Sequence, residues 1–206
     1  MEIKTRQIEI LEAAGALLNE QGIGGLTTKN LAKKVGFAES ALYRHYGNKE
    51  EIVAALLQFL HSEMERRLPP IAAQTELPPG VRLRRLFGSQ LDFLAAHPHF
   101  LTAVFSEGML KFSPAVHERI LQLMSVMRGA VGRIVEEGQK SGAFTDEIPA
   151  AELTHVLIGS FRLLMLRWRI ANFGFDVKSE GKKHVEHLVL LISKRKCPNI
   201  ISTKIW

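Results

Sequence analysis

Residues 26–51 read LTTKNLAKKVGFAESALYRHYGNKEE, and this stretch decides the fold. Thr27 or Thr28 can cap a helix that continues to Val35, and Gly36 provides its stop. A second, short helix is predicted from about residue 39 to residue 46. Apolar side chains of both helices would face inward, namely Leu31, Ala32, Val35, Phe37, Leu42 and Tyr46. Two short helices joined by a glycine-containing turn form a helix-turn-helix, whose second helix has the size to enter a DNA major groove.

The segments on either side of this stretch are also predicted to be helical. Before it, apolar residues at helical spacing form one stripe that ends at the glycines 22, 24 and 25: Ile8, Leu11, Ala14, Leu17 and Leu18. After it, Asn48 and Glu51 have the spacing of a capping box that opens a long helix to about Leu68. Helical periodicity continues beyond that point, and it predicts helices at roughly 81–96, 99–110, 114–140, 149–172 and 180–195.

No stretch of the chain shows the sustained alternation typical of a strand, so the sequence predicts an all-α protein. Proline pairs at 69–70 and 78–79 remove backbone donors, and we expect helices to stop there. Pro114 and Pro149 are predicted to be the first residues of two of these helices, a position where a missing N–H costs nothing. The proline pairs make 68–80 the clearest boundary in composition between a small N-terminal module and a larger C-terminal one.

Composition excludes several classes of protein. The chain has 206 residues, of which 46% are hydrophobic and 23% charged, as in ordinary globular proteins. No run approaches the roughly 18 uncharged residues of a membrane span. Cys197 is the single cysteine, which rules out an intramolecular disulfide, and the sequence predicts a soluble cytoplasmic protein without a membrane partner.

Net charge is informative only locally. The whole excess of +6 belongs to residues 68–206, because residues 1–67 hold nine basic and nine acidic residues. Between Thr28 and Lys49, however, five basic residues face one acid, Glu39. This local excess, rather than the overall charge, supports contact with nucleic acid.

The same residues resemble the TetR family of bacterial transcriptional regulators. The match runs in order and spacing from the opening helix through Leu26-Thr27-Thr28, Leu31-Ala32, Gly36, Leu42-Tyr43-Arg44-His45-Tyr46 and Asn48-Lys49-Glu50-Glu51, which covers about residues 5–58. The resemblance implies a helix-turn-helix DNA-binding domain at 1–50 and a helical effector-binding and dimerisation domain at 51–206. It also implies a repressor that a small-molecule effector releases from a palindromic operator.

Carried over position by position, the resemblance implies contacts with double-stranded DNA. Thr28 and Lys29 would touch phosphate or a base edge, and Tyr43, His45 and Lys49 would clamp phosphates, which position a protein without reading sequence. The full set of implied DNA-binding residues is Thr28, Lys29, Glu39, Ser40, Ala41, Tyr43, Arg44, His45 and Lys49. Glu39 could accept from a cytosine amino group, or it could be a solvated acid favoured by the helix dipole.

The C-terminal part is rich in large apolar side chains, which at helical spacing are usually core. The family resemblance implies that some of them line a cavity for a hydrophobic effector, with Arg84, Glu107, Arg128 and Arg162 as possible polar handles. The expected ligand-binding residues are Phe93, Phe105, Met109, Met124, Phe161 and Met165. Flexible methionines among aromatic rings favour broad selectivity.

The resemblance further implies a homodimer built from the last two helices of each chain. Small residues beside large ones in the 149–172 helix permit close approach of a second helix. The expected interface residues are Leu157, Gly159, Ser160, Phe161, Leu164, Leu188, Leu191 and Ile192.

Other chemistries have little support in the sequence. The histidine pairs 97/99 and 184/187 lack the carboxylate or cysteine company of a metal site, and no phosphate loop or nucleophile elbow is visible, so we expect no metal, no cofactor and no enzyme activity. One alternative stays open: the C-terminal domain could dock a protein partner instead of a small effector. A closed apolar cavity would favour the effector, and a solid core would favour the partner. The apolar tail at 199–206 has no explanation.

Overall fold

The computed structural model describes residues 2–43, 46–105 and 112–194. Within those ranges the regular elements are helices: α1 (Glu2–Gly25), α2 (Thr28–Val35), α3 (Glu39–Tyr43), α4 (Lys49–Ala72), α5 (Pro79–Ala96), α6 (Phe100–Phe105), α8 (Pro114–Lys140), α9 (Ala150–Ile170) and α10 (Val177–Ile192). One isolated antiparallel bridge joins Phe144 to Ser193. The predicted all-α class is confirmed.

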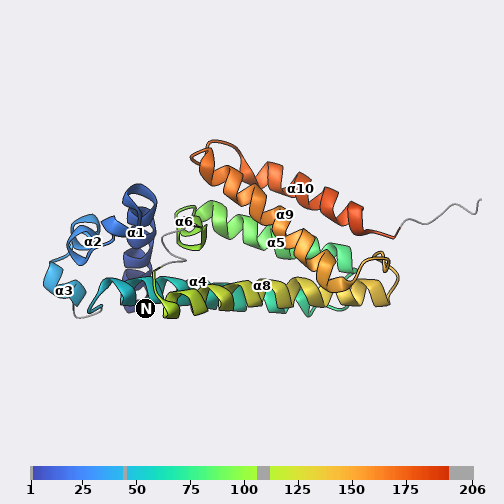
Figure 1. Ribbon diagram of the computed structural model, residues 1–206, viewed down its shortest axis with the longest axis horizontal. Coiled ribbons are helices and arrows are strands. Elements are labelled where there is room, and N and C mark those ends of the chain that lie inside the picture. The colour runs from blue at the N-terminus through green and yellow to red at the C-terminus, as the bar shows by residue number, and fades with distance from the viewer. Residues whose placement is uncertain (1, 44–45, 106–111, 195–206) are drawn as a thin grey trace, which may run out of the picture.

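The molecule is elongated, with α1, α2 and α3 together at one end (Figure 1). From that end α4 runs side by side with α8. The helices α5, α9 and α10 lie together along one side of this pair. The helix α4 contacts α1 at one end of the molecule and α5 and α8 along the rest. It is therefore the element that joins the N-terminal helices to the C-terminal bundle.

The helix-capping residues predicted from the sequence are confirmed. The Thr27 hydroxyl accepts from the amide of Asn30 at 3.1 Å and opens α2, and Gly36 closes it in the left-handed conformation with φ of 72°. The Asn48 side chain accepts from the amide of Glu51 at 3.0 Å and opens α4. The Glu51 carboxylate in turn accepts from the amide of Gly47 at 2.8 Å, one residue earlier than in the usual capping box.

The prediction that Pro69 and Pro70 stop the long helix was wrong, because α4 continues through both prolines to Ala72. Two intrahelical hydrogen bonds are lost there, since neither proline has an N–H. Tertiary contacts compensate for the loss: Leu68 and Ala72 are buried, and buried Arg82 of α5 donates to the carbonyl oxygen of Ala72 at 2.9 Å. Packing against the neighbouring helices thus outweighs the local preference of proline.

Other helix ends differ by a few residues from the predictions. The last helix begins at Val177 because the Asp176 carboxylate accepts from the amides at positions 178 and 179, both at 3.1 Å. Pro149 is the residue before α9 and not its first residue. The predicted 99–110 helix is described only up to Phe105. In the described part of the chain, no helix combines the length and apolarity needed to cross a membrane.

Candidate DNA-binding surface and effector groove

The helix-turn-helix has the predicted core. Leu31 of α2 and Leu42 of α3 are fully buried, and Ala32 and Tyr46 are buried beside them. The other two predicted core residues, Val35 and Phe37, are partly buried against the same cluster. Because α2 packs against α1 and α3 packs against α2, the polar residues Lys29, Glu39 and Ser40 are left exposed on the outer surface.

The N-terminal ends of α2 and α3 lie close together on that surface. The Thr28 hydroxyl donates to the Glu39 carboxylate at 3.1 Å, which joins the first residue of α2 to the first residue of α3. Lys29 and Ser40 are exposed beside this pair, and Ala41 is half-buried. The Glu39 carboxylate is exposed and has one intramolecular partner, so its role in base reading stays a prediction.

The other DNA-binding residues predicted on the short helix are Tyr43, Arg44 and His45. Tyr43 is the last residue of α3. Arg44 and His45 lie outside the described residues. The phosphate contacts implied for Tyr43 and His45, and the DNA contact implied for Arg44, therefore stay predictions.

Lys49 opens α4 and touches the C-terminal domain as well. Its ammonium lies 5.4 Å from the centroid of the Phe112 ring, within range of a cation–π interaction. The neighbouring Glu50 carboxylate accepts from the Ser113 hydroxyl at 2.6 Å, and Ser113 caps α8. The first turn of α4, which the sequence places at the DNA backbone, is therefore tied to the start of α8.

A second junction joins α1 to His97, which follows α5, and to α6. The Glu12 carboxylate lies 2.7 Å from Nδ1 of His97, and the Thr102 hydroxyl donates to the Asn19 side chain at 2.9 Å. Between these two contacts, Gly15 faces Phe100 so closely that an added Cβ would lie 3.1 Å from the ring. The N-terminal helices are thus anchored to the bundle at two separate places.

The residues expected to line an effector cavity do not come together in the structure. Phe161 and Met165 are buried in the core, and the Phe161 ring packs on Phe87 with 5.0 Å between centroids. Met124 is 45% exposed on α8, where its sulfur lies 4.0 Å from Nη1 of Arg162. The side chain of Phe105 and the whole of Met109 lie outside the described residues.

The suggested polar handles are also dispersed. Arg84 is ion-paired with Glu186 on α10 at 2.7 Å, and Arg128 is exposed. Glu107 lies outside the described residues. Only Phe93 among the expected ligand-binding residues lines a described cavity of the size of a small-molecule site.

That cavity is an open groove of about 820 Å³ between α4 and α5. Ile8 of α1 contributes to its lining, as do Phe59 of α4 and His97 after the end of α5. The lining residues combine apolar and charged side chains: Ile8, Phe59, Glu63, Arg66, Arg67, Ile71, Gln74, Arg85, Gly88, Ser89, Asp92, Phe93 and His97. The groove therefore differs in character from the purely apolar cavity that the sequence favoured.

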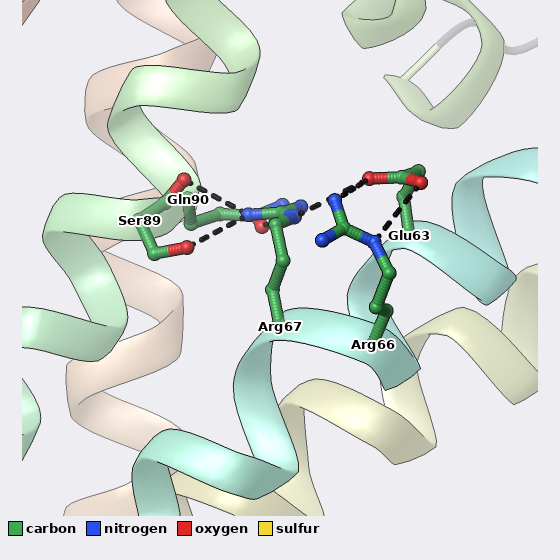
Figure 2. A network of polar contacts seen from close by, with 5 residues as sticks. All are labelled: Glu63, Arg66, Arg67, Ser89 and Gln90. Atoms are coloured by element: carbon green, nitrogen blue, oxygen red, sulfur yellow. Dashed lines mark hydrogen bonds and ion pairs between the residues drawn. The ribbon is translucent and has the colours of Figure 1, made fainter.

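An arginine network crosses the middle of the groove (Figure 2). Arg67 donates through Nη1 to the carbonyl oxygen of Ser89 at 2.9 Å and to its hydroxyl at 3.1 Å, and through Nη2 to Gln90 at 3.1 Å. Its guanidinium also stacks on Phe93, 4.4 Å from the ring centroid. Arg66 forms an ion pair with Glu63 at 2.7 Å, and this hydrogen bond is the main cause that lowers the pKa of the Glu63 carboxyl.

The expected dimer residues divide into two groups. Leu157, Phe161, Leu164, Leu188 and Ile192 are buried within the subunit. Gly159 and Leu191 are exposed, and Ser160 is half-buried with its hydroxyl 2.9 Å from Nε2 of His184. Burial lowers the pKa of His184. Besides Leu191, the large apolar side chains that α9 and α10 leave on the surface are ones that the sequence did not single out: Val156, Leu163, Ile170 and Leu190.

Sequence reasoning missed the groove arginines. Arg66 and Arg67 stand in a helix that alternates charged and apolar residues, as many exposed helices do, so nothing marked one of them as buried. The one local hint was the glycine at 88 inside a helical pattern, because glycine weakens a helix interior unless something requires it.

Comparison with known proteins supports both halves of the chain. The N-terminal domain of bacterial regulatory proteins of the tetR family matches residues 10–56, and the tetracyclin repressor-like C-terminal domain matches residues 79–184. The HTH-type transcriptional repressor SCO4008 of Streptomyces coelicolor is 30% identical over 162 residues, which cover 78% of this chain and 76% of that protein. The nucleoid occlusion factor SlmA of Vibrio cholerae is 31% identical over 161 residues, covering 75% and 81%.

Solved structures show the same fold at lower identity. The ketosteroid transcriptional regulator KstR2 of Mycobacterium tuberculosis superposes with a TM-score of 0.77 at 22% identity, covering 92% of this chain and 96% of that one. The regulator FadR of Bacillus subtilis in complex with stearoyl-CoA gives a TM-score of 0.73 at 18% identity, covering 88% and 97%.

Proposed function

Because this chain belongs to the tetR family of bacterial regulatory proteins and is a DNA-binding transcriptional regulator, we propose that it acts as a homodimeric repressor that a small-molecule effector releases from its operator. The observation that carries the DNA-binding part is the joined pair of helix ends at Thr28 and Glu39, which presents Lys29 and Ser40 outward on a buried helix-turn-helix core. A two-fold dimer then requires an operator with two-fold symmetry.

The exposed apolar stripe of α9 supports the dimer. Val156, Leu163 and Ile170 recur every seven residues and are 49%, 66% and 73% exposed. Gly159 lies in the same stripe, and an added Cβ there would meet no atom within 4 Å, so the stripe has room for a close neighbour. Leu190 and Leu191 extend the apolar surface onto α10. We assign these residues to the interface, because burial of their apolar area favours association of two copies.

The dimer is tested at one position with two substitutions. Leu163→Arg puts a charge in the stripe, and we expect a monomer by sedimentation at micromolar concentration. Leu163→Met keeps the position apolar and should remain dimeric. A Leu163→Arg protein that is folded and still dimeric would place the interface elsewhere.

Two routes can carry an effector signal to the DNA-binding helices. One runs from the start of α8 through Phe112 and Ser113 to the first turn of α4. The other runs from His97 to Glu12 of α1. By linkage, an effector weakens operator binding only as far as it binds better to the arrangement that DNA disfavours, typically by about 1–3 kcal/mol.

Genomic binding in the native host, followed by gel shift on the recovered sites, tests the repressor directly. We expect a palindromic site whose affinity falls when Ser40→Ala or Lys29→Ala is introduced, and transcription that rises when the gene is deleted. Binding that is equal on operator and random DNA, or transcription that falls on deletion, would contradict the repressor.

One alternative has specific support. Relatives named nucleoid occlusion factor SlmA match three quarters of the chain, and the expected apolar cavity residues Phe161 and Met165 lie in a packed core. A DNA-binding protein whose C-terminal domain docks a protein partner fits both observations. A panel of small molecules that never changes operator affinity, together with a partner that does, would favour this alternative.

A further inference from the structure

The groove between α4 and α5 carries charges that the fold itself does not balance. Three arginines line it, at positions 66, 67 and 85, against two acids, Glu63 and Asp92. Asp92 is paired at 3.0 Å with Lys178, which lies outside the lining. Glu63 is thus the remaining acid for three guanidinium groups, and the groove has an excess of two positive charges.

Arg67 is the most deeply placed of these cations. Its side chain is only 13% exposed, and this burial lowers the pKa of its guanidinium. The buried Nε has no hydrogen-bond partner, and the nearest carboxylate oxygen, from Glu63, is 3.9 Å away. A buried cation with an unused donor is costly unless an anion pairs with it.

Arg85 adds a second unsatisfied cation at the other side of the groove. It is exposed and hydrogen-bonds the Gln74 amide oxygen at 3.2 Å, a neutral partner. No carboxylate of the described residues is ion-paired with it. Its neighbour Arg84, by contrast, is paired with Glu186 at 2.7 Å and faces α10.

Part of the lining is apolar and leaves room. Phe59, Ile71 and Phe93 contribute rings and an aliphatic side chain, and Ile8 of α1 is also a lining residue. Gly88 forms part of the wall, and an added Cβ there would meet nothing within 4 Å. Packing does not require this glycine, although a glycine costs the helix about 1 kcal/mol relative to alanine. We infer that the missing side chain keeps the groove open at this point.

We propose that this groove is the effector site and that it binds an amphipathic anion, whose carboxylate or phosphate head pairs with Arg67 and Arg85 while its apolar chain lies on Phe59 and Phe93. The volume of about 820 Å³ suits a ligand of that kind. This inference rests on the proposed effector-controlled function and deepens it, because Ile8 of α1 lines the groove, and His97, also in the lining, pairs with Glu12 of α1. The ligand therefore contacts the DNA-binding domain directly.

Calorimetric titration of the purified full chain with dodecanoate, dodecyl phosphate and dodecan-1-ol, each below its micelle-forming concentration, tests the chemistry. Because dodecanoate and dodecyl phosphate both have a negatively charged head group, at least one of them should bind saturably. The anion that binds with the higher affinity identifies the preferred head group. The neutral alcohol should bind about ten-fold more weakly or worse. An alcohol that binds as tightly as both anions, or no saturable binding of either anion, overturns the proposal.

Matched variants test the location. Gly88→Leu fills the groove without a clash, and Arg85→Gln removes a head-group partner, so each should weaken anion binding about ten-fold. Gly129→Leu, at another glycine with open space, and Arg84→Gln, at the paired neighbour, should bind like the wild type. Glu63→Gln should tighten binding several-fold, because it removes the acid that competes for the arginines. Gly88→Leu and Arg85→Gln proteins that melt normally and bind like the wild type would overturn the assignment.

The same variants keep this inference separate from the proposed function. Without ligand, Gly88→Leu should bind operator DNA like the wild type, since it touches no predicted DNA-binding residue. A protein that binds the anions in the groove but no DNA would refute the repressor and leave the groove site standing. A repressor released by a compound that Gly88→Leu still binds would refute the groove and leave the repressor standing.

Discussion

Replacement of Lys49 by glutamine should weaken operator binding in a manner that depends on salt. Lys49 lies in the first turn of α4, half-buried beside Phe112, and the sequence assigns its ammonium to a DNA phosphate. Each phosphate neutralised by a protein cation contributes about 0.9 to the slope of log K against log salt. A symmetric dimer would lose two such contacts, so the slope should fall by about 1.8.

The same relation gives the loss of affinity at a fixed salt concentration. At about 0.15 M salt one phosphate contact is worth roughly five-fold in binding, and two contacts are worth roughly thirty-fold. Fluorescence anisotropy of a labelled operator, repeated at four or five salt concentrations, measures both quantities. The loss should be equal on operator and on random DNA, because a phosphate clamp does not read sequence.

Lys34→Gln is the matched control for this measurement. It removes the same charge from the same domain, but the Lys34 ammonium is already paired with Glu20 at 2.7 Å. We expect its salt slope to equal that of the wild type. An unchanged slope in Lys49→Gln, or an equal fall in both variants, would refute the assignment of Lys49 to phosphate.

Three further changes have defined outcomes. Gly181→Ala should lower the free energy of unfolding of the wild type in denaturant, because its Cβ would lie 2.5 Å from a methyl carbon of buried Leu91. In a Leu91→Ala background the same substitution should raise the free energy of unfolding by about 1 kcal/mol. Equal effects in the two backgrounds would show that the two residues do not compete for space. Burial places the folded-state pKa of His184 below its ordinary value of 6.5, so the unfolded state takes up the proton first as pH falls and stability drops below about pH 6.5. His184→Gln should show a smaller loss of melting temperature between about pH 7.5 and pH 5.5, and the same pH profile as the wild type would contradict this. Asn48→Ala should cost about 1 kcal/mol of unfolding free energy and reduce operator affinity, because the capped turn carries Lys49, while Asn48→Ser, which caps the helix without adding a charge, should retain both.

Local chemistry explains where prediction from sequence succeeded. The starts of α2 and α4 follow from Thr27 and Asn48, whose side chains reach an amide only three residues away. Such contacts form within one turn and need no knowledge of the rest of the chain. The helix-turn-helix core was equally readable, because its two helices are short and adjacent in sequence.

The same local reasoning failed where distant residues decide the outcome. Pro69 and Pro70 should end a helix, but Arg82, in the first turn of α5, donates to the carbonyl oxygen of Ala72 and supports the last turn of α4. Phe161 and Met165 looked equivalent to Phe93 by type and spacing. Their positions relative to the neighbouring helices made the first two core and the third part of a groove.

The sequence by itself determined that the chain is all-α, where most helices begin, and that its N-terminal part is a helix-turn-helix of the tetR family. Only the tertiary structure decided which face of each helix is interior. In α9 apolar residues occupy more than one face, so periodicity could not tell buried Leu157 from exposed Val156. Likewise only packing against Ser89 and Phe93 made Arg67 a buried cation with an unused donor, because burial depends on residues more than twenty positions away in the chain.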